Sequence, residues 1–252
     1  MNIALEFFQY LLKAKGRHGT HSPYVYDFVD VCLRLPIPSD IKYGFKNYFH
    51  GLRTNPSSIE VMDYGAGSKK MGKRRRVSKM ARVSGSNGKY GELLFRITQH
   101  NKPAKVLELG TSLGIGSWML SRGNTNAAMT TVEGCPNTYN FVKNELSSLS
   151  NIKCVNASFV HFLESNHTHY DVVFIDGDHR GSSVMEMLEL LEPTLKEETI
   201  IIIDDIRWSE DMLCHWKQIV AMERYHLTMD LFRMGIVVKR SHQQKEHFIV
   251  KY

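Results

Sequence analysis

The stretch from Val106 to Ser117 constrains the fold of this chain more than any other segment. It begins with the apolar run Val-Leu-Glu-Leu, continues through Gly110, Gly114 and Gly116, and leads into a helix-like Ser-Trp-Met-Leu sequence. A strand, a glycine turn and a helix in this order begin a doubly wound α/β sheet, which holds a ligand above the turn. Glycine lets the backbone approach a ligand where a Cβ atom would collide, and the first helical turn offers free N–H groups. The spacing G-x-x-x-G-x-G differs from the dinucleotide-binding G-x-G-x-x-G.

Strands and helices are predicted to alternate after Pro103. Apolar runs predict strands at residues 105–109, 128–133, 152–156, 170–176 and 199–204. Helical patterns fill the intervals at residues 115–122, 137–148, 158–165, 182–192 and 208–223. This alternation favours a parallel sheet with helices on both faces. Residues 227–232 and 236–238, separated by Arg-Met-Gly, predict a final antiparallel pair.

The sequence before this alternation predicts a different organisation. We expect residues 1–84 to form a helical N-terminal extension and residues 85–252 to form the main domain. Apolar side chains recur at helical spacing in residues 2–15, 23–35, 40–52 and 90–100. The segment 63–67, Asp-Tyr-Gly-Ala-Gly, also resembles a glycine turn, but no second strand ending in an acid follows it. We therefore predict a loop there, and the tail 241–252 has no assignment.

The composition is typical of a soluble globular protein, with 42% hydrophobic and 23% charged residues. No run approaches the ~20 apolar residues that a membrane span needs. The N-terminal segment carries Glu6 and no cleavage site, so we do not expect a signal peptide. The four cysteines contain no C-x-x-C pair, which favours a reduced, cytoplasmic protein over a disulfide or zinc framework.

The positive charge is concentrated in one segment. The formal net charge is +6, and residues 69–82 contain eight Lys and Arg residues and no acid. Without that segment the remaining chain would carry a net charge of −2. A solvated helix face is the ordinary explanation, and binding of an anionic partner is the alternative. Aromatic residues interleaved with the charges, which would favour single-stranded nucleic acid, are absent.

The second predicted strand ends at Glu133, where an acid can accept hydrogen bonds from a ribose diol. Residues 108–114, in the form E-x-G-x-x-x-G, resemble motif I of class I S-adenosylmethionine-dependent methyltransferases. The final antiparallel pair resembles that family too, so the resemblance covers about residues 105–240. It implies a Rossmann-like α/β fold with a doubly wound, seven-stranded sheet, mostly parallel and with an antiparallel C-terminal hairpin.

The resemblance also implies where S-adenosylmethionine lies. It assigns the ribose to Glu133, the amino-acid end of the cofactor to Glu108, and the adenine to the loop that follows the third strand. A buried role in capping a helix is the alternative for Glu108. The implied cofactor contacts are Glu108, Gly110, Thr111, Ser112, Gly114, Glu133, Ala157, Ser158 and Asp176.

Four aspartates follow two neighbouring predicted strands. Asp176 and Asp178 come after the fourth strand, and Asp204 and Asp205 after the fifth. The carboxyl ends of adjacent parallel strands share the edge of the sheet where ligands bind. Carboxylates gathered there repel one another, so they must be protonated or meet a cation. Oxygen ligands suit Mg²⁺, Ca²⁺ or Mn²⁺ and not zinc. The alternative is a set of solvated aspartates that cap helices or form turns.

The segments F-I-D-G-D-H and I-I-D-D resemble metal-dependent O-methyltransferases, namely catechol-type enzymes and their sugar-hydroxyl-methylating relatives. The resemblance implies that Asp176, Asp204 and Asp205 bind the metal. Asp205 stands where the catechol-type enzymes have Asn, while the sugar-methylating relatives have an acid pair. The resemblance also favours His179 as general base, in a catalytic group with Asp176 and Asp178. Histidine exchanges protons near neutral pH.

These features predict an O-methyltransferase that acts on a small-molecule hydroxyl. A divalent cation such as Mg²⁺ would lower the pKa of the hydroxyl and orient its oxygen. The N-terminal helices would cover the acceptor pocket or form a homodimer surface, and we expect no membrane partner. Three alternatives remain open. They are a metal-free methyltransferase of a small molecule or RNA that uses residues 69–82, a nicotinamide dehydrogenase, and a non-catalytic S-adenosylmethionine-binding protein.

Overall fold

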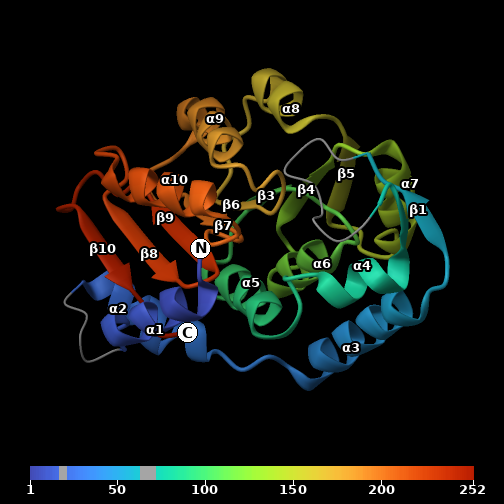
Figure 1. Cartoon of the computed structure of the whole chain (residues 1–252), viewed down its shortest axis with the longest axis horizontal. Coiled ribbons are helices and arrows are strands. Elements are labelled where there is room, and N and C mark those ends of the chain that lie inside the picture. The colour runs from blue at the N-terminus through green and yellow to red at the C-terminus, as the bar shows by residue number, and fades with distance from the viewer. Residues whose placement is uncertain (17–21, 63–71) are drawn as a thin grey trace.

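The computed structural model of the chain describes residues 1–16, 22–62 and 72–252. At its centre lies an eight-stranded sheet in the order β10-β8-β9-β7-β6-β3-β4-β5 (Figure 1). Strand β9 is antiparallel to β7 and β8, and the other neighbouring pairs are parallel. The strands are β3 (Lys105–Leu109), β4 (Ala128–Glu133), β5 (Ile152–Asn156), β6 (Val172–Ile175), β7 (Ile200–Ile203), β8 (Leu227–Leu231), β9 (Met234–Val238) and β10 (Glu246–Ile249).

The predicted fold class is confirmed, but the predicted count of seven strands is wrong. The eighth strand, β10, lies in the tail that the sequence left unassigned, and it pairs in parallel with β8. Its sequence, Glu-His-Phe-Ile, is short and half polar, so it carries no strong strand pattern. The pairing also depends on a partner strand that is not adjacent in the chain.

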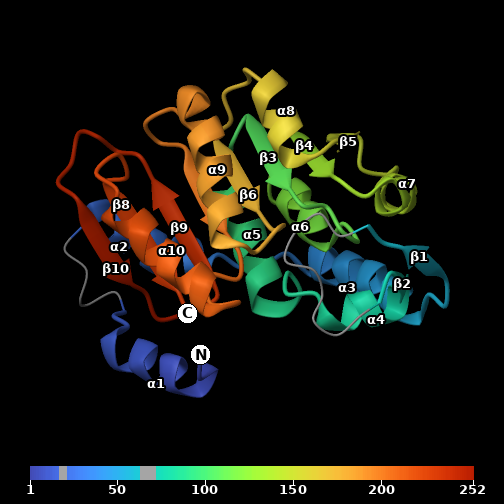
Figure 2. The ribbon, with the colours of Figure 1, turned by 45° about the horizontal axis from the view of Figure 1, so that its top comes forward.

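Helices cover both faces of the sheet (Figure 2). The sheet separates the hydrophobic core into two clusters, one on each face. Side chains alternate along each strand. Phe174 and Ile202 pack in the cluster that contains α2, α5, α6 and α7, while Val173 and Ile201 pack in the cluster that contains α8, α9 and α10. The helices after the first strand of the sheet are α6 (Ile115–Gly123), α7 (Pro136–Glu145), α8 (Phe159–Ser165), α9 (Gly181–Leu191) and α10 (Glu210–Ala221).

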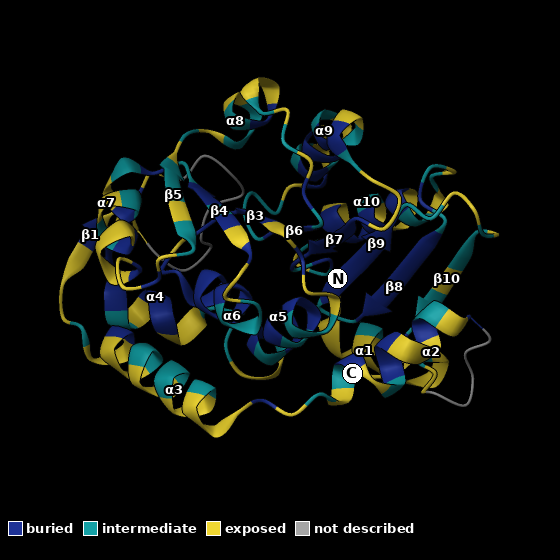
Figure 3. Ribbon diagram, turned by 180° about the vertical axis from the view of Figure 1, so that it is seen from behind, coloured by how far each residue is buried: buried dark blue, intermediate teal, exposed yellow. Residues whose placement is uncertain are grey.

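Strands in the middle of the sheet are buried on both faces (Figure 3). All four isoleucines of β7 are buried, which matches the prediction of a central strand that is apolar on both sides. Strand β10 is only partly buried, as befits the edge of the sheet. The central strands therefore fix the positions of the loops at their carboxyl ends.

The described residues of the N-terminal part are mainly helical. Its helices are α1 (Ile3–Lys13), α2 (Pro23–Asp30), α3 (Ser39–Thr54) and α4 (Val77–Val83), and α5 (Gly88–Asn101) follows. A 3₁₀ turn covers Cys32–Arg34, and a second covers Glu192–Thr194 after α9. Val25 and Phe28 of α2 lie in the same core cluster as Leu93 of α5. The boundary between residues 84 and 85 stays a prediction.

The basic segment is only partly helical where the structure describes it. Residues 74–76 form β2 (Arg74–Arg76), which pairs with β1 (Ser58–Glu60), and α4 follows directly. Arg74 and Arg76 are exposed, whereas Arg75 is buried between them. The predicted loop at residues 63–67 lies outside the described residues.

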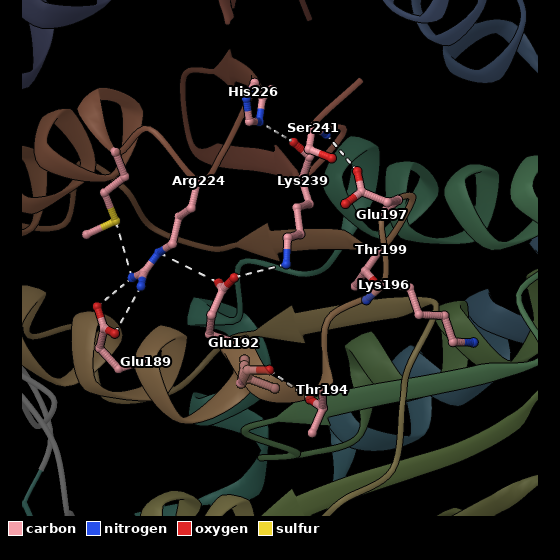
Figure 4. Close-up of polar contacts among 12 residues, drawn as sticks. Glu189, Glu192, Thr194, Lys196, Glu197, Thr199, Arg224, His226, Lys239 and Ser241 are labelled. Atoms are coloured by element: carbon pink, nitrogen blue, oxygen red, sulfur yellow. Dashed lines mark hydrogen bonds and ion pairs between the residues drawn. The ribbon is translucent and has the colours of Figure 1, made fainter. Parts of the chain in front are cut away.

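Ion pairs join the end of α9 to the segments around β8 and β9 (Figure 4). The Arg224 guanidinium donates to the Glu189 carboxylate at 2.5 and 2.9 Å and lies 3.7 Å from Glu192. Lys239 pairs with Glu192 at 3.2 Å. Among the described helices, none combines the length and the apolar character that crossing a membrane requires.

Candidate active site

A cavity of about 540 Å³ opens at the carboxyl ends of the central strands. Gly110 and Ser112, after β3, and Glu133, at the end of β4, line one part of it. Asp176, after β6, and Asp205, after β7, line another. The structure thus brings the glycine turn and part of the predicted acidic rim into one cavity.

The backbone at Gly110 requires glycine. Its φ angle is +108°, which other residues rarely adopt, and a Cβ atom there would lie 2.3 Å from the carbonyl oxygen of Asp176. The Gly110 N–H donates to Val132 O at 2.9 Å, and the Asp176 N–H donates to Leu109 O at 2.9 Å. The glycine turn and the start of the acidic rim therefore lie directly against each other.

The Glu133 carboxylate is held by two backbone donors. Oε2 accepts from the Ser112 N–H and Oε1 from the Cys135 N–H, both at 2.9 Å. Burial raises the pKa of this carboxyl, while the backbone hydrogen bonds oppose the rise. A carboxylate can accept about four hydrogen bonds, so both oxygens keep capacity for hydroxyl groups of a ligand. The contact with Ser112 also fixes the glycine turn relative to β4.

Glu108 lies outside the cavity wall. It is 1% exposed and accepts hydrogen bonds from Ser117 Oγ of α6 and, at 2.6 Å, from Thr131 Oγ1 of β4. Burial raises its pKa to about 7. These contacts join β3 to the neighbouring helix and strand, which agrees with the buried structural alternative. Thr111, Gly114 and Ala157 are also absent from the cavity wall, and their roles as cofactor contacts stay predictions.

The loop after β5 contributes Ser158 and Phe159 to the cavity wall. The Ser158 side chain accepts from the His161 N–H and caps α8. The Phe159 ring packs so closely on Gly177 that a Cβ atom there would lie 2.6 Å from the ring. Asn156 Nδ2 donates to Glu133 O at 2.7 Å, which ties this loop to the end of β4. An aromatic wall next to an acid that can accept from a ribose suits a nucleoside.

Asp176, Asp205 and His179 meet at the other end of the cavity. His179 Nε2 lies 4.0 Å from Asp176 Oδ1 and 3.8 Å from Asp205 Oδ2. Burial, followed by the nearby charges of Asp204 and Asp205, raises the pKa of Asp176 well above its usual value. Burial and the charge of Asp204 also raise the pKa of Asp205, to about 6. The rim therefore favours partners that carry positive charge or donate protons.

Arg233 supplies positive charge to this rim, and the sequence did not identify it. Its Nε and Nη2 atoms donate to the two oxygens of Asp204 at 2.9 and 2.8 Å. Nη2 also lies 3.0 Å from Asp205 Oδ1. Burial opposes its charge, but the carboxylates of Asp204 and Asp205 raise the pKa of Arg233 overall. Asp204 itself is 1% exposed and lies behind the cavity wall.

The predicted metal ligands do not fit a divalent cation. Both Asp204 oxygens are committed to the Arg233 guanidinium, and a cation bound there would have to displace or face that positive charge. Within residues 1–16, 22–62 and 72–252, no group of three or more His, Cys, Asp or Glu side chains is arranged to hold a metal ion. The three aspartates do gather as predicted, but around an arginine.

Asp178 also lines the cavity, with its side chain paired to Arg180. Arg180 Nε and Nη2 donate to its two oxygens at 2.7 and 2.6 Å. Burial raises the pKa of Asp178, but the hydrogen bonds from Arg180 and Ser183 outweigh it, so the pKa is lowered overall. Its predicted place in the catalytic group stays a prediction, since this ion pair already occupies the carboxylate.

Part of the cavity wall comes from the N-terminal region, whose helices were expected to cover the acceptor pocket or form a homodimer surface, although the sequence did not single out the lining residues. Met80 and Val83 of α4, with Ser84 and Gly85, line the cavity, and Ser86 Oγ donates to Asp176 Oδ2 at 3.0 Å. Trp208, after β7, also lines the wall, and its ring centroid is 5.5 Å from that of His179. The sequence signal for these contacts is weak. It consists of Trp208, which follows the Asp204-Asp205 pair, and of the small residues 84–86.

The fold and the cavity define a class of protein. A doubly wound sheet with one antiparallel strand near its end carries a glycine turn, a ribose-type acid and an acidic rim in one cavity. These features are those of the class I S-adenosylmethionine-dependent methyltransferase fold. Residues 107–206 match a family described as "Methyltransferase domain".

Solved structures share this fold at low sequence identity. The SAH-bound methyltransferase PaMTH1 of Podospora anserina is 14% identical, with 87% of this chain and 97% of that chain covered and a TM-score of 0.56. An O-methyltransferase from Bacillus cereus in complex with SAH is 17% identical, with 85% and 96% covered and a TM-score of 0.52. Cofactor-bound Rv0187 from MTB is 15% identical, with 88% and 98% covered and a TM-score of 0.56. None of the curated proteins matches the chain.

Proposed function

We propose that this methyltransferase transfers the methyl group of S-adenosylmethionine to a hydroxyl oxygen of a small molecule. One observation carries the proposal. A single cavity joins Gly110, Ser112 and Glu133 to Asp176, His179 and Asp205. If S-adenosylmethionine binds over the glycine turn, its sulfonium group would therefore lie next to side chains that can accept a proton.

The cofactor is proposed to bind through backbone and carboxylate groups. Glu133 accepts from the ribose hydroxyls, and the Phe159 ring lies against the adenine. The amino-acid chain of the cofactor is proposed to lie along the backbone of the turn at Gly110 and Ser112, which both line the cavity. The SAH molecules bound in the Podospora anserina and Bacillus cereus structures support this choice of cofactor. The Bacillus cereus structure is described as an O-methyltransferase, which supports oxygen as the acceptor atom.

The transfer requires a proton acceptor next to the hydroxyl group. In the proposed step the hydroxyl proton moves to His179 Nε2, and the oxygen attacks the methyl carbon. The carbon–sulfur bond breaks with its electron pair left on sulfur, and the sulfonium becomes a neutral thioether. Asp176 and Asp205, at 4.0 and 3.8 Å, stabilise the imidazolium that forms. Correct alignment of the two reactants can recover roughly 7–11 kcal/mol of the barrier.

The predicted divalent cation has no place in this proposal. Two of its three predicted ligands, Asp204 and Asp205, pair with Arg233, so every step above uses side chains of the chain itself. The substrate hydroxyl is expected to lie on the Trp208 side of the cavity, since Trp208 and His179 are neighbours there.

The proposal is tested in two stages. Calorimetry with SAH measures cofactor binding, and transfer of radiolabelled methyl groups to panels of hydroxyl, amine and thiol compounds identifies the acceptor atom. We expect SAH binding and labelled products from hydroxyl compounds. Labelling confined to amines or thiols would refute oxygen as the acceptor, and absence of SAH binding would refute the whole proposal.

An anionic acceptor such as RNA is a second candidate, and one observation favours it. Arg75 and Met80 line the cavity, while Arg74, Arg76 and Lys79 in the same segment are exposed. One arginine of the basic segment thus belongs to the cavity wall, and its exposed neighbours in the chain carry further positive charge. An RNA substrate would bind with an affinity that falls steeply with added salt. If the protein does not bind RNA even at 50 mM salt, this candidate function is refuted.

A further inference from the structure

The most unusual group near the cavity is the side chain of Arg233. It lies in the tight turn between β8 and β9, and its guanidinium reaches Asp204 and Asp205 across the sheet edge. It lines the active-site cavity and also a neighbouring cavity of about 800 Å³ that includes Tyr90 and Phe232. The sequence suggested only a turn at this position.

The surroundings of Arg233 are shaped to hold a guanidinium. A Cβ atom at Gly85 would lie 1.4 Å from Arg233 Nη2 and 2.1 Å from Nη1, so a larger residue at position 85 would displace the group. The Tyr90 ring centroid lies 5.7 Å from its Cζ atom, within the range of a cation–π contact. Tyr90 Oη in turn donates to Leu231 O at 3.0 Å, one residue before the turn.

The turn that carries Arg233 is held from several directions. The Phe232 N–H donates to Asp230 Oδ1 at 2.8 Å, and the Ile206 N–H donates to Arg233 O at 2.9 Å. Arg207 donates to both Asp230 oxygens at 2.9 and 2.7 Å and to Phe232 O at 2.6 Å. A cation on a fixed backbone keeps its position while a substrate binds, so it is already oriented for the reaction.

Nε and Nη2 of Arg233 are committed to aspartates, but Nη1 is not. No side chain or carbonyl among the described residues accepts a hydrogen bond from Nη1, although it lies beside Gly85 of the cavity wall. An N–H donor with positive charge is therefore left beside the cavity wall, on the guanidinium that contacts Asp205.

We propose that Arg233 is the built-in cation of the acceptor site and takes the place of a divalent metal ion. Its Nη1 group donates to the acceptor oxygen, holds it in line with the methyl group, and stabilises the negative charge that develops as His179 removes the proton. Nε and Nη2 meanwhile stay paired with Asp204 and Asp205, which holds the guanidinium in place. This inference rests on the proposed function, and it adds that the reaction needs no added metal.

The first test needs neither an acceptor nor turnover. Mn²⁺ is added to the purified protein, and the free ion is measured by electron paramagnetic resonance. We expect the wild type to leave Mn²⁺ free at micromolar concentration. Arg233→Ala should leave the carboxylates of Asp176, Asp204 and Asp205 without this cation and should therefore bind Mn²⁺. The double variant, Arg233→Ala with Asp204→Asn, should not bind it. Stoichiometric Mn²⁺ binding by the wild type, lost in Asp204→Asn, would overturn the inference.

Arg224→Ala is the matched control, because Arg224 also pairs with two carboxylates and its side chain has the same exposed fraction of 26%. We expect it to bind no Mn²⁺. If Arg233→Ala does not fold, the wild-type titration and the Arg233→Lys variant still test the inference. Lysine keeps the positive charge, so Arg233→Lys should leave Mn²⁺ free.

The second test uses the acceptor that the hydroxyl panel identifies. Wild-type turnover should be unchanged in EDTA, and Arg233→Ala should lower kcat by about 100-fold or more, as loss of a donor to a developing oxyanion does in other enzymes. Arg233→Lys should retain more activity than Arg233→Ala. Turnover that stops in EDTA and returns with Mg²⁺, or an Arg233→Ala variant with wild-type kcat, would overturn the inference while leaving methyl transfer intact.

Discussion

Replacement of Glu133 tests the donor half of the cavity most directly. Its two oxygens accept from Ser112 and Cys135 and keep capacity for the ribose hydroxyls. A hydrogen bond to a charged group contributes about 1.5–3 kcal/mol, so loss of two such bonds in Glu133→Ala costs about 3 kcal/mol at the low end. That corresponds to a Kd for SAH about 100-fold weaker. Glu133→Gln keeps one acceptor oxygen and should weaken binding by about tenfold.

Calorimetry with SAH measures these affinities, and circular dichroism checks that each variant is folded. Glu145→Ala is the control, because this exposed acid lies on α7, the helix that follows Glu133, and outside the cavity. Its affinity should equal that of the wild type. A folded Glu133→Ala protein that binds SAH within about threefold of the wild type would show that the ribose is held elsewhere, and the orientation of the cofactor would have to be reversed.

Three further outcomes follow from the geometry. Gly110→Ala forces a Cβ atom onto a carbonyl oxygen at 2.3 Å and adds strain of about 1–3 kcal/mol, so calorimetry should give a Kd for SAH weaker by about fivefold or more; wild-type affinity would contradict this. Because burial raises the pKa of Glu108 to about 7, the folded state binds the proton more tightly than the unfolded chain. This proton contributes about 3 kcal/mol to the free energy of unfolding, in full below pH 4.5, and the contribution is lost as the pH rises through 7. In urea unfolding, Glu108→Gln should therefore make the free energy of unfolding depend less on pH, and an unchanged pH dependence would refute this reasoning. Gly235→Ala would place a Cβ atom 2.5 Å from the buried Trp216 ring and should lower the free energy of unfolding by about 1–3 kcal/mol, whereas Gly51→Ala, with no atom within 4 Å, should not.

The sequence predicted the sheet well wherever one segment carries its own signal. Strands β3, β4 and β5 lie where their apolar runs place them, because β-branched and apolar runs between turns leave little choice of register. Strand β10 was missed because two of its four residues are polar and its partner is not adjacent in the chain. Local pattern cannot specify such a pairing.

The same distinction applies to the cavity. Glu133, Asp176 and Asp205 could be placed together because the carboxyl ends of parallel strands meet at one edge. The part played by Arg233 could not, because Arg-Met-Gly specifies a turn but not the direction of its first side chain. The lining residues of α4 were missed for a related reason, since the contact joins segments with no shared motif.

Strand β10 has a consequence for the behaviour of the molecule in solution. Every residue of β8 is buried, and without β10 one side of that strand would present unpaired N–H and carbonyl groups. An apolar strand edge of that kind recruits strands from other molecules. Strand β10 covers that side of β8 with a short, partly polar strand, and the residues around Ile249 and Val250 contact Lys15 and, in α1, Tyr10, so this apolar strand is not open to strands of other molecules.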